Sequence, residues 1–188
     1  MRSSLIGLLS ILVWSGSASA LKFEGVEMAD SQVVGGKTLV LNGKALRKVR
    51  RFGMNFKVYV GGLYLTEKSS DGAKIIASPE PKVFEFTFLR TVGAGDLEES
   101  YSNGFKGACG ECEAYQEQIK KLLGVMTKMK EGHRITIVFL PESVTYSIGD
   151  KDRKTVQLDG KAFRDLFLSM YVGPNPVTPD VKPGLLGL

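Results

Sequence analysis

Apolar and polar side chains alternate along much of this chain, which is the spacing of a β-strand with one buried face. In residues 83–92, Phe84, Phe86 and Phe88 recur at every second position, so their side chains project from one face of a strand. Short turn signals separate similar segments, and tight turns join antiparallel neighbours. The predicted strands span residues 38–41, 44–50, 56–66, 83–92, 134–140, 143–148 and 153–158.

Two dipeptides predict where this sheet turns back on itself. Asn42-Gly43 is typical of a two-residue hairpin turn, and we expect it to end the first strand. Pro141-Glu142 lies between two alternating segments and predicts a second hairpin.

Apolar residues recur every three or four positions elsewhere, as on a helix with one buried face. Asp96 is a suitable N-cap for a first helix, and further helices are predicted over residues 113–130 and 161–172. Thr178-Pro179 is predicted to begin a short helical turn. Because these helices are clustered, we predict an α+β fold in which a layer of helices covers one face of a large antiparallel sheet.

The first twenty residues have the organisation of a secretory signal peptide. Arg2 precedes a mostly apolar stretch over residues 5–14, and Ala18-Ser19-Ala20 has the small residues of a cleavage site. The apolar stretch is shorter than the roughly 20 residues that a membrane-spanning helix needs. We therefore predict cleavage after Ala20, a single domain over residues 21–188, and a periplasmic or secreted location.

Composition narrows the function further. The chain is 43% hydrophobic and 24% charged, as in an ordinary globular protein, and no stable membrane span is predicted. Loss of Arg2 with the signal peptide lowers the formal net charge from +5 to +4, which gives no reason to expect a nucleic-acid partner. One histidine, His133, and two cysteines cannot supply the four ligands usual for structural zinc. We expect no metal and no cofactor, and the oligomeric state stays open.

Arg47 and Tyr59 are the first candidate functional residues. If residues 44–50 and 56–62 form a hairpin about Gly53, opposed residue numbers add up to 106, so Arg47 faces Tyr59. Directly opposed side chains share a face with Cβ atoms ~5 Å apart. A guanidinium beside a phenol is a suitable receptor for a carboxylate.

The competing interpretation is that this segment is a solvated basic ribbon. It carries six lysines and arginines between residues 44 and 57. A register slip of one residue would place Arg47 and Tyr59 on opposite faces. From the geometry alone, both interpretations stay open.

Several segments resemble the chalcone isomerase-like superfamily, and more closely its exported bacterial branch. The resemblance implies the α+β fold predicted above. It also implies one of two functions: closure of a flavanone ring by isomerases, or binding of a fatty acid between sheet and helices. The segments that carry it are residues 41–48, 56–65, 88–90, 101–102, 172–177 and 185–187.

The resemblance assigns roles to individual residues. Arg47 matches the cleft arginine of the family, and Tyr101 is similar to the active-site tyrosine of the enzymes. At Tyr59 the fatty-acid binders have tyrosine, whereas the enzymes have threonine. The cleft asparagine of the enzymes falls on Ala108 here, and their C-terminal threonine or serine falls near Met170, or on Ser169 if the alignment shifts by one residue.

These matches favour a non-catalytic binding protein for a fatty acid or similar apolar carboxylate. The headgroup would lie at Arg47 and Tyr59, with Tyr101 nearby. The alternative is an isomerase or lyase acting on a phenolic or enone substrate, in which Arg47 and Tyr101 would be the catalytic residues. The predicted apolar lining of the cleft includes Leu63, Leu122, Met126 and Met170.

Cys109 and Cys112 are separated by two residues and precede a predicted helix. In an exported protein such a pair most simply forms a structural disulfide. A redox-active pair is the alternative, although a thioredoxin-like site follows directly after a strand, and here a helix end precedes the pair.

Overall fold

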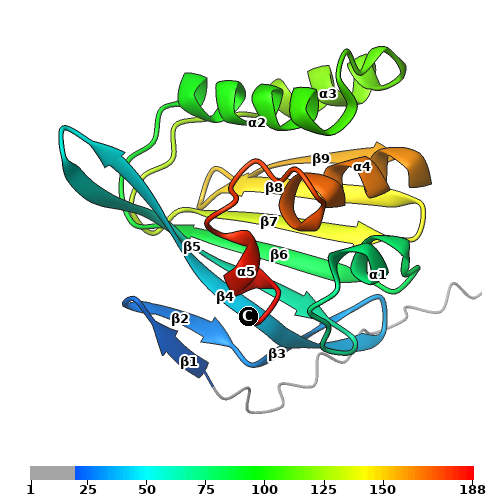
Figure 1. Cartoon of the computed structure of the whole chain (residues 1–188), viewed down its shortest axis with the longest axis horizontal. Coiled ribbons are helices and arrows are strands. Elements are labelled where there is room, and N and C mark those ends of the chain that lie inside the picture. Colours follow the sequence, from blue (N-terminus) through cyan, green and yellow to red (C-terminus); the bar gives the residue numbers. More distant parts are fainter. Residues whose placement is uncertain (1–19) are drawn as a thin grey trace, which may run out of the picture.

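The computed structural model of the protein describes residues 20–188 (Figure 1). Apart from Ala20, the predicted signal peptide lies outside these residues. Seven strands form one antiparallel sheet in sequential order, each hydrogen-bonded to the next along the chain. They are β3 (Ser31–Val34), β4 (Lys37–Arg51), β5 (Met54–Leu65), β6 (Lys82–Phe88), β7 (Arg134–Leu140), β8 (Ser143–Gly149) and β9 (Lys154–Asp159).

Helices cover one face of this sheet, and a two-stranded hairpin packs on the other. Leu97 and Phe105 of one helix and Phe167 of another are buried in the main core against the sheet, whereas Val26 and Met28 of the hairpin pack with Val60 on the opposite face. The predicted α+β class is therefore confirmed. The helices are α1 (Gly72–Ala77), α2 (Ala94–Cys109), a 3₁₀ turn (Glu113–Tyr115), α3 (Gln116–Leu123), α4 (Lys161–Val172) and α5 (Lys182–Leu185), and the hairpin is β1 (Ala20–Phe23) with β2 (Val26–Ala29).

Aromatic side chains fill the space between the sheet and the helices. Phe84, Phe86 and Phe88 of β6 are each at most 3% exposed and face the helices, as their alternation predicted. Tyr171 of α4 stacks on two of them, with ring centroids 4.9 Å from Phe84 and 5.4 Å from Phe86. Within residues 20–188, no helix is both long enough and apolar enough to cross a membrane.

The predicted turn at Asn42-Gly43 is wrong, because β4 runs through it without a break. Asn42 is instead the extra residue of a bulge between the Leu41 and Gly43 pairings. Its buried amide donates to the carbonyl oxygens of Ser69 at 3.0 Å and Leu185 at 2.9 Å. The bulge lets this side chain bind two distant segments, and that tertiary role overrides the local preference for a turn.

The helix predicted over residues 113–130 is much shorter, since α3 ends at Leu123 and Gly124 follows. Met129 then lies in an extended segment, where its amide donates to the carbonyl of Val92 at 3.0 Å. The strand predicted to reach Val92 likewise ends at Phe88. The periodic methionines are buried as expected, but in a loop that returns to the core.

Other elements differ from the prediction in smaller ways. The helix α2 begins at Ala94, and Asp96 accepts a hydrogen bond from the Gly93 amide at 3.2 Å from inside its first turn. The turn predicted at Thr178-Pro179 is present, since the Thr178 carbonyl accepts from the Val181 amide at 3.0 Å, and α5 follows it from Lys182. The short elements β1, β2, β3 and α1 carry too few apolar repeats to be predicted.

Candidate ligand-binding site

Two adjoining cavities lie between the β4–β5 hairpin and the start of α2. The outer one is an open groove of about 560 Å³. It leads to an inner chamber of about 50 Å³ under the helices. The two share five lining residues, namely Tyr59, Phe88, Leu97, Ser100 and Thr178.

The strand register places Arg47 and Tyr59 at this site. They are directly opposed in the β4–β5 ladder, which confirms the predicted pairing. On the tip side of this pair Lys48 faces Lys57, so Val58 is an extra residue that bulges from β5. Val58 and Tyr59 both line the groove, because a bulge turns two consecutive side chains toward one face.

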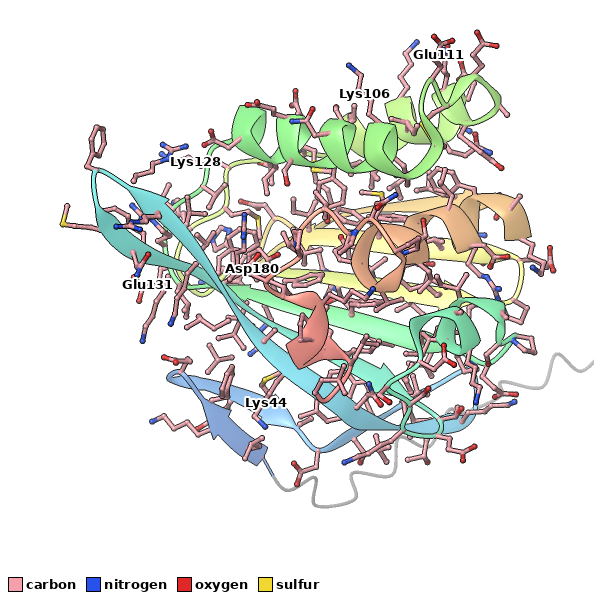
Figure 2. All side chains as sticks on the ribbon, viewed as in Figure 1. Lys44, Lys106, Glu111, Lys128, Glu131 and Asp180 are labelled. Atoms are coloured by element: carbon pink, nitrogen blue, oxygen red, sulfur yellow. A yellow bond between two sulfur atoms is a disulfide. The ribbon has the colours of Figure 1, made fainter. Side chains whose placement is uncertain are left out.

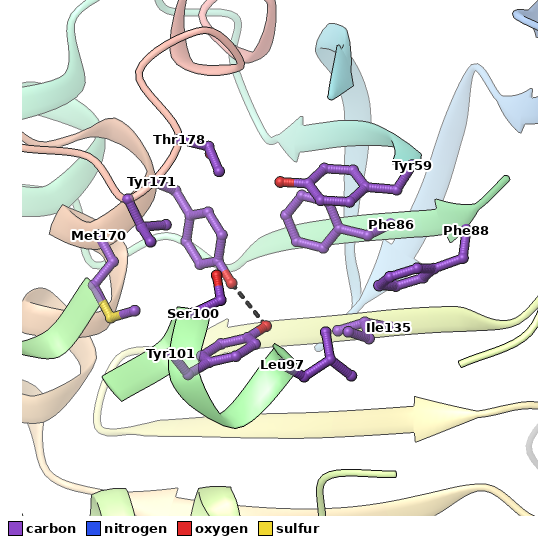
Figure 3. A pocket seen from close by; sticks show the side chains of 11 residues that line it. Tyr59, Phe86, Phe88, Leu97, Ser100, Tyr101, Ile135, Met170, Tyr171 and Thr178 are labelled. Carbon is purple, nitrogen blue, oxygen red and sulfur yellow. Dashed lines mark hydrogen bonds between the residues drawn. The ribbon is translucent and has the colours of Figure 1, made fainter. Parts of the chain in front are cut away.

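Tyr59 lines both the groove and the chamber, and Figure 3 shows its ring among the side chains of the chamber. Its ring packs edge-on against Phe86, with centroids 5.2 Å apart, and lies 5.7 Å from Phe88. Burial raises the pKa of the Tyr59 phenol well above its ordinary value, and the nearby Thr178 and Arg47 only partly oppose this. The hydroxyl is therefore neutral at physiological pH and able to donate a hydrogen bond.

Arg47 lines the groove but already has an anionic partner in the same chain. Its guanidinium forms an ion pair with Asp180, which lies between α4 and α5 (Figure 2). The side chains of Arg47 and Asp180 are 27% and 43% exposed. Arg47 is thus neither a vacant receptor nor part of a solvated ribbon, since an internal carboxylate occupies it at the edge of the groove.

The inner chamber is mostly apolar with a few hydroxyl groups. Tyr171 donates a hydrogen bond to the Tyr101 hydroxyl at 3.0 Å (Figure 3). Burial raises the pKa of Tyr101 to about 12, so this phenol is neutral and unsuited to act as a base near neutral pH. Phe86, Ile135 and Met170 supply apolar walls.

The predicted site residues therefore separate into two groups. Tyr59, Tyr101 and Met170 line the inner chamber, and Arg47 lines the groove beside it. By contrast, Leu63, Leu122 and Met126 line neither of these two cavities, because they are buried in the core between sheet and helices. Hydrophobic spacing identifies the inward-facing positions but does not show where packing leaves a space.

Residues missed from the sequence come mainly from the segment that follows α4. Thr178 lines both cavities, and Asp180 binds Arg47 from the next turn. Neither belongs to a periodic pattern, so no sequence signal marks them. Arg90, which also lines the groove, lies over the Phe56 ring at 4.8 Å, an arrangement that depends on the strand register.

Cys109 and Cys112 form the predicted disulfide, with Cα atoms 5.2 Å apart. The bond joins the last residue of α2 to the residue that precedes the 3₁₀ turn. Neither cysteine lines the groove or the chamber. The preceding element is the helix α2 rather than a strand, so the context is that of a structural disulfide.

The fold and the site together define a class of protein. Its members have an antiparallel sheet with sequential strand order and a layer of helices over an apolar cavity, with an arginine beside that cavity. The sequence matches the chalcone isomerase-like family over residues 20–187, and the chain belongs to that family. No curated protein matches the sequence at a significant level.

A similar solved structure is the crystal structure of a fatty-acid binding protein from Arabidopsis thaliana. The two chains superimpose with a TM-score of 0.67 at 15% sequence identity. The match covers 89% of this chain and 96% of the plant protein. At this identity the comparison establishes the shared fold.

Proposed function

We propose that the protein is an exported, non-catalytic binding protein for a fatty acid or a similar apolar carboxylate. The headgroup binds at Arg47 and Tyr59, and the hydrocarbon tail lies against the apolar walls of the groove and chamber. The ligand class that the plant relative is named for supports this proposal. Export is supported by the signal-peptide pattern of residues 1–20.

The observation that carries the proposal is the ion pair between Arg47 and Asp180. In this ion pair an internal carboxylate lies against the guanidinium at the edge of the groove, which supports carboxylate binding there. The neutral Tyr59 hydroxyl, on the directly opposed position of β5, adds a donor to the same face. A ligand carboxylate that replaces Asp180 binds both the Arg47 guanidinium and the Tyr59 hydroxyl.

The cavity volumes indicate where the tail lies. The chamber of about 50 Å³ has room for only a short segment, whereas the groove of about 560 Å³ is much larger. Each buried methylene contributes about 0.8 kcal/mol, so tail burial sets the affinity. The headgroup contacts contribute about 1.5–3 kcal/mol for a charge-assisted hydrogen bond and fix the orientation.

Native mass spectrometry followed by lipid extraction tests this proposal. The purified protein is expected to carry a stoichiometric carboxylic acid, and Arg47→Ala is expected to lose it. Arg153→Ala is the matched control, because Arg153 is an exposed arginine that lines neither cavity. An intact fold with unchanged occupancy in Arg47→Ala would disprove the headgroup assignment.

A second candidate function is an isomerase or lyase of the chalcone isomerase type. In its favour, Tyr101 and Arg47 line the same pair of adjoining cavities. The neutral Tyr101 hydroxyl would donate to a carbonyl oxygen and Arg47 would bind the anionic oxygen. A chalcone cyclisation assay decides this, since a rate equal to that in buffer removes the reaction.

A further inference from the structure

The tip of the β4–β5 hairpin projects beyond the other strands of the sheet (Figure 1). Two large apolar side chains, one in the turn and one directly after it, do not pack against the core. Phe52 is 94% exposed and Met54 is 58% exposed. Within residues 20–188, the other exposed large hydrophobic residues are Leu21, Val33 and Leu188, which are far apart in the sequence, so Phe52 and Met54 form an unusual apolar pair.

Phe52 occupies a backbone conformation that does not suit it. Its φ is +51° and that of Gly53 is +75°, as in a two-residue turn of the type that favours Asn-Gly. A bulky residue with positive φ is a true outlier, and such strain is found preferentially at functional sites. An aromatic side chain here costs stability and gains almost no packing against the rest of residues 20–188.

The strands next to the tip carry only positive charge. Between residues 44 and 57 there are six lysines and arginines and no acidic residue. Arg47 pairs with Asp180 and Lys57 with Glu24. Lys48, Arg50 and Arg51 form no ion pair with any residue in the described range 20–188, so their charges face the solvent around the apolar point.

We infer that the hairpin tip is a docking surface for an anionic lipid membrane. Phe52 and Met54 enter the interfacial layer, and Lys48, Arg50 and Arg51 bind the lipid headgroups. Aromatic residues inserted at the interface together with a basic surface are the two contributions that stabilise peripheral membrane binding. A purely anionic partner such as a nucleic acid would use the cations but would leave the apolar pair in water.

The groove opens beside this docking surface, which connects membrane docking with ligand entry. Arg51 and Phe52 belong to the tip and also line the groove of about 560 Å³ that leads to Tyr59. An apolar ligand could therefore move between the membrane and the groove without crossing bulk water. Membrane docking does not rest on the proposed function, because Arg47→Ala is expected to remove the ligand while Phe52, Met54 and Arg50 at the tip stay unchanged.

Vesicle cosedimentation tests the inference. Vesicles of equimolar phosphatidylglycerol and phosphatidylcholine are expected to bind the protein, and high salt is expected to weaken binding. Vesicles of phosphatidylcholine alone are expected to bind little. Phe52→Asn should lower the affinity at least about tenfold, and Arg50→Gln with Arg51→Gln should lower it about fivefold for each charge.

Matched variants separate docking from general surface effects. Val33→Asn removes another exposed apolar side chain, 70% exposed on β3, and Lys120→Gln with Lys121→Gln removes two exposed charges from α3; both should bind as the parent does. All variants are compared with the same N-terminus, as established by mass measurement. Phe52→Asn relieves the strained turn, so its melting temperature should not fall.

A fluorescent reporter shows directly whether the tip enters the membrane. Trp14 is the only tryptophan, so Phe52→Trp in a Trp14→Phe background has one tryptophan at the tip. Its emission should shift to the blue on anionic vesicles and be quenched by brominated lipids, whereas Val33→Trp in the same background should not respond. An unchanged emission on anionic vesicles, or vesicle binding by Phe52→Asn equal to that of the parent, would each overturn the inference.

Discussion

Arg47 and Tyr59 face each other across β4 and β5 because Val58 bulges out of the ladder between them and the hairpin tip. Without this extra residue, the pairings from the tip would continue as residue numbers that add up to 105, and Arg47 would face Val58. Tyr59 would then project from the opposite face. One bulged residue thus determines which side chain joins the arginine at the groove.

Removing the Tyr59 hydroxyl should weaken the binding of a carboxylate without disturbing the fold. Tyr59→Phe keeps the ring that packs edge-on against Phe86 but loses the neutral donor. A hydrogen bond to a charged acceptor contributes about 1.5–3 kcal/mol, so the dissociation constant for a fatty acid should rise at least about tenfold. Calorimetric titration measures this, with Tyr115→Phe, which lies outside both cavities, as the control.

Equal affinity in the Tyr59→Phe variant would show that Arg47 alone binds the headgroup. A large fall in melting temperature would instead show that the hydroxyl has a structural role.

Releasing Arg47 from Asp180 should have the opposite effect on affinity. Asp180→Asn removes the internal carboxylate that competes with the ligand for the guanidinium. Partly exposed ion pairs contribute up to about 1 kcal/mol, so the affinity for a fatty acid should increase by a factor of up to about five. Displacement of a fluorescent fatty acid measures the change, and Asp150→Asn, an exposed aspartate outside both cavities, is the control.

Weaker binding by Asp180→Asn would assign a different role to Asp180, namely holding the loop before α5 in place. Tyr59→Phe and Asp180→Asn are therefore expected to change the affinity for a fatty acid in opposite directions. A general loss of stability would lower the affinity in both variants.

Much of the fold follows from local sequence rules. The alternation of Phe84, Phe86 and Phe88 marks a strand with one buried face, and α4 was predicted with the bounds that it has. Asn42 shows where such rules fail, because its amide binds segments that lie 27 and 143 residues away. A local preference gives way where a distant partner stabilises another conformation.

The candidate site was predictable only in part, and for a similar reason. The facing of Arg47 and Tyr59 was predicted from a turn about Gly53, but the turn is Phe52-Gly53 and the bulge at Val58 supplies the missing residue. Asp180 follows α4 in a loop without periodicity, so its contact with Arg47 depends wholly on tertiary structure. The volumes of the two cavities depend on packing that no spacing encodes.

The close approach of α5 to β4 should make Gly43 intolerant of a side chain. A Cβ atom at Gly43 would lie 2.2 Å from the Gly184 carbonyl oxygen and 2.5 Å from that of Leu185. Overpacking of this kind costs about 1–3 kcal/mol, so Gly43→Ala should lower the melting temperature by several degrees. Gly107 lies in α2, and a Cβ atom there would meet no atom within 4 Å beyond the backbone of the helix itself. Gly107→Ala should therefore raise the free energy of unfolding by about 0.5–1 kcal/mol.

A Gly43→Ala protein as stable as the parent would contradict the requirement for close backbone contact. Thermal unfolding followed by circular dichroism distinguishes the outcomes, and the Gly107→Ala control excludes a general effect of replacing glycine by alanine.

Alkaline pH should destabilise the protein through its buried tyrosines, and Tyr101 gives the clearest test. Burial raises the pKa of Tyr101 from 10.0 to about 12, so between these values the unfolded chain loses a proton that the folded chain keeps. The free energy of unfolding then falls by about 1.4 kcal/mol for each pH unit from this residue alone. Urea unfolding of the parent and of Tyr101→Phe at several pH values measures the difference. Above pH 10 the free energy of unfolding should decline less steeply in the variant. Parallel curves would show that Tyr101 has the same pKa in the folded and unfolded states.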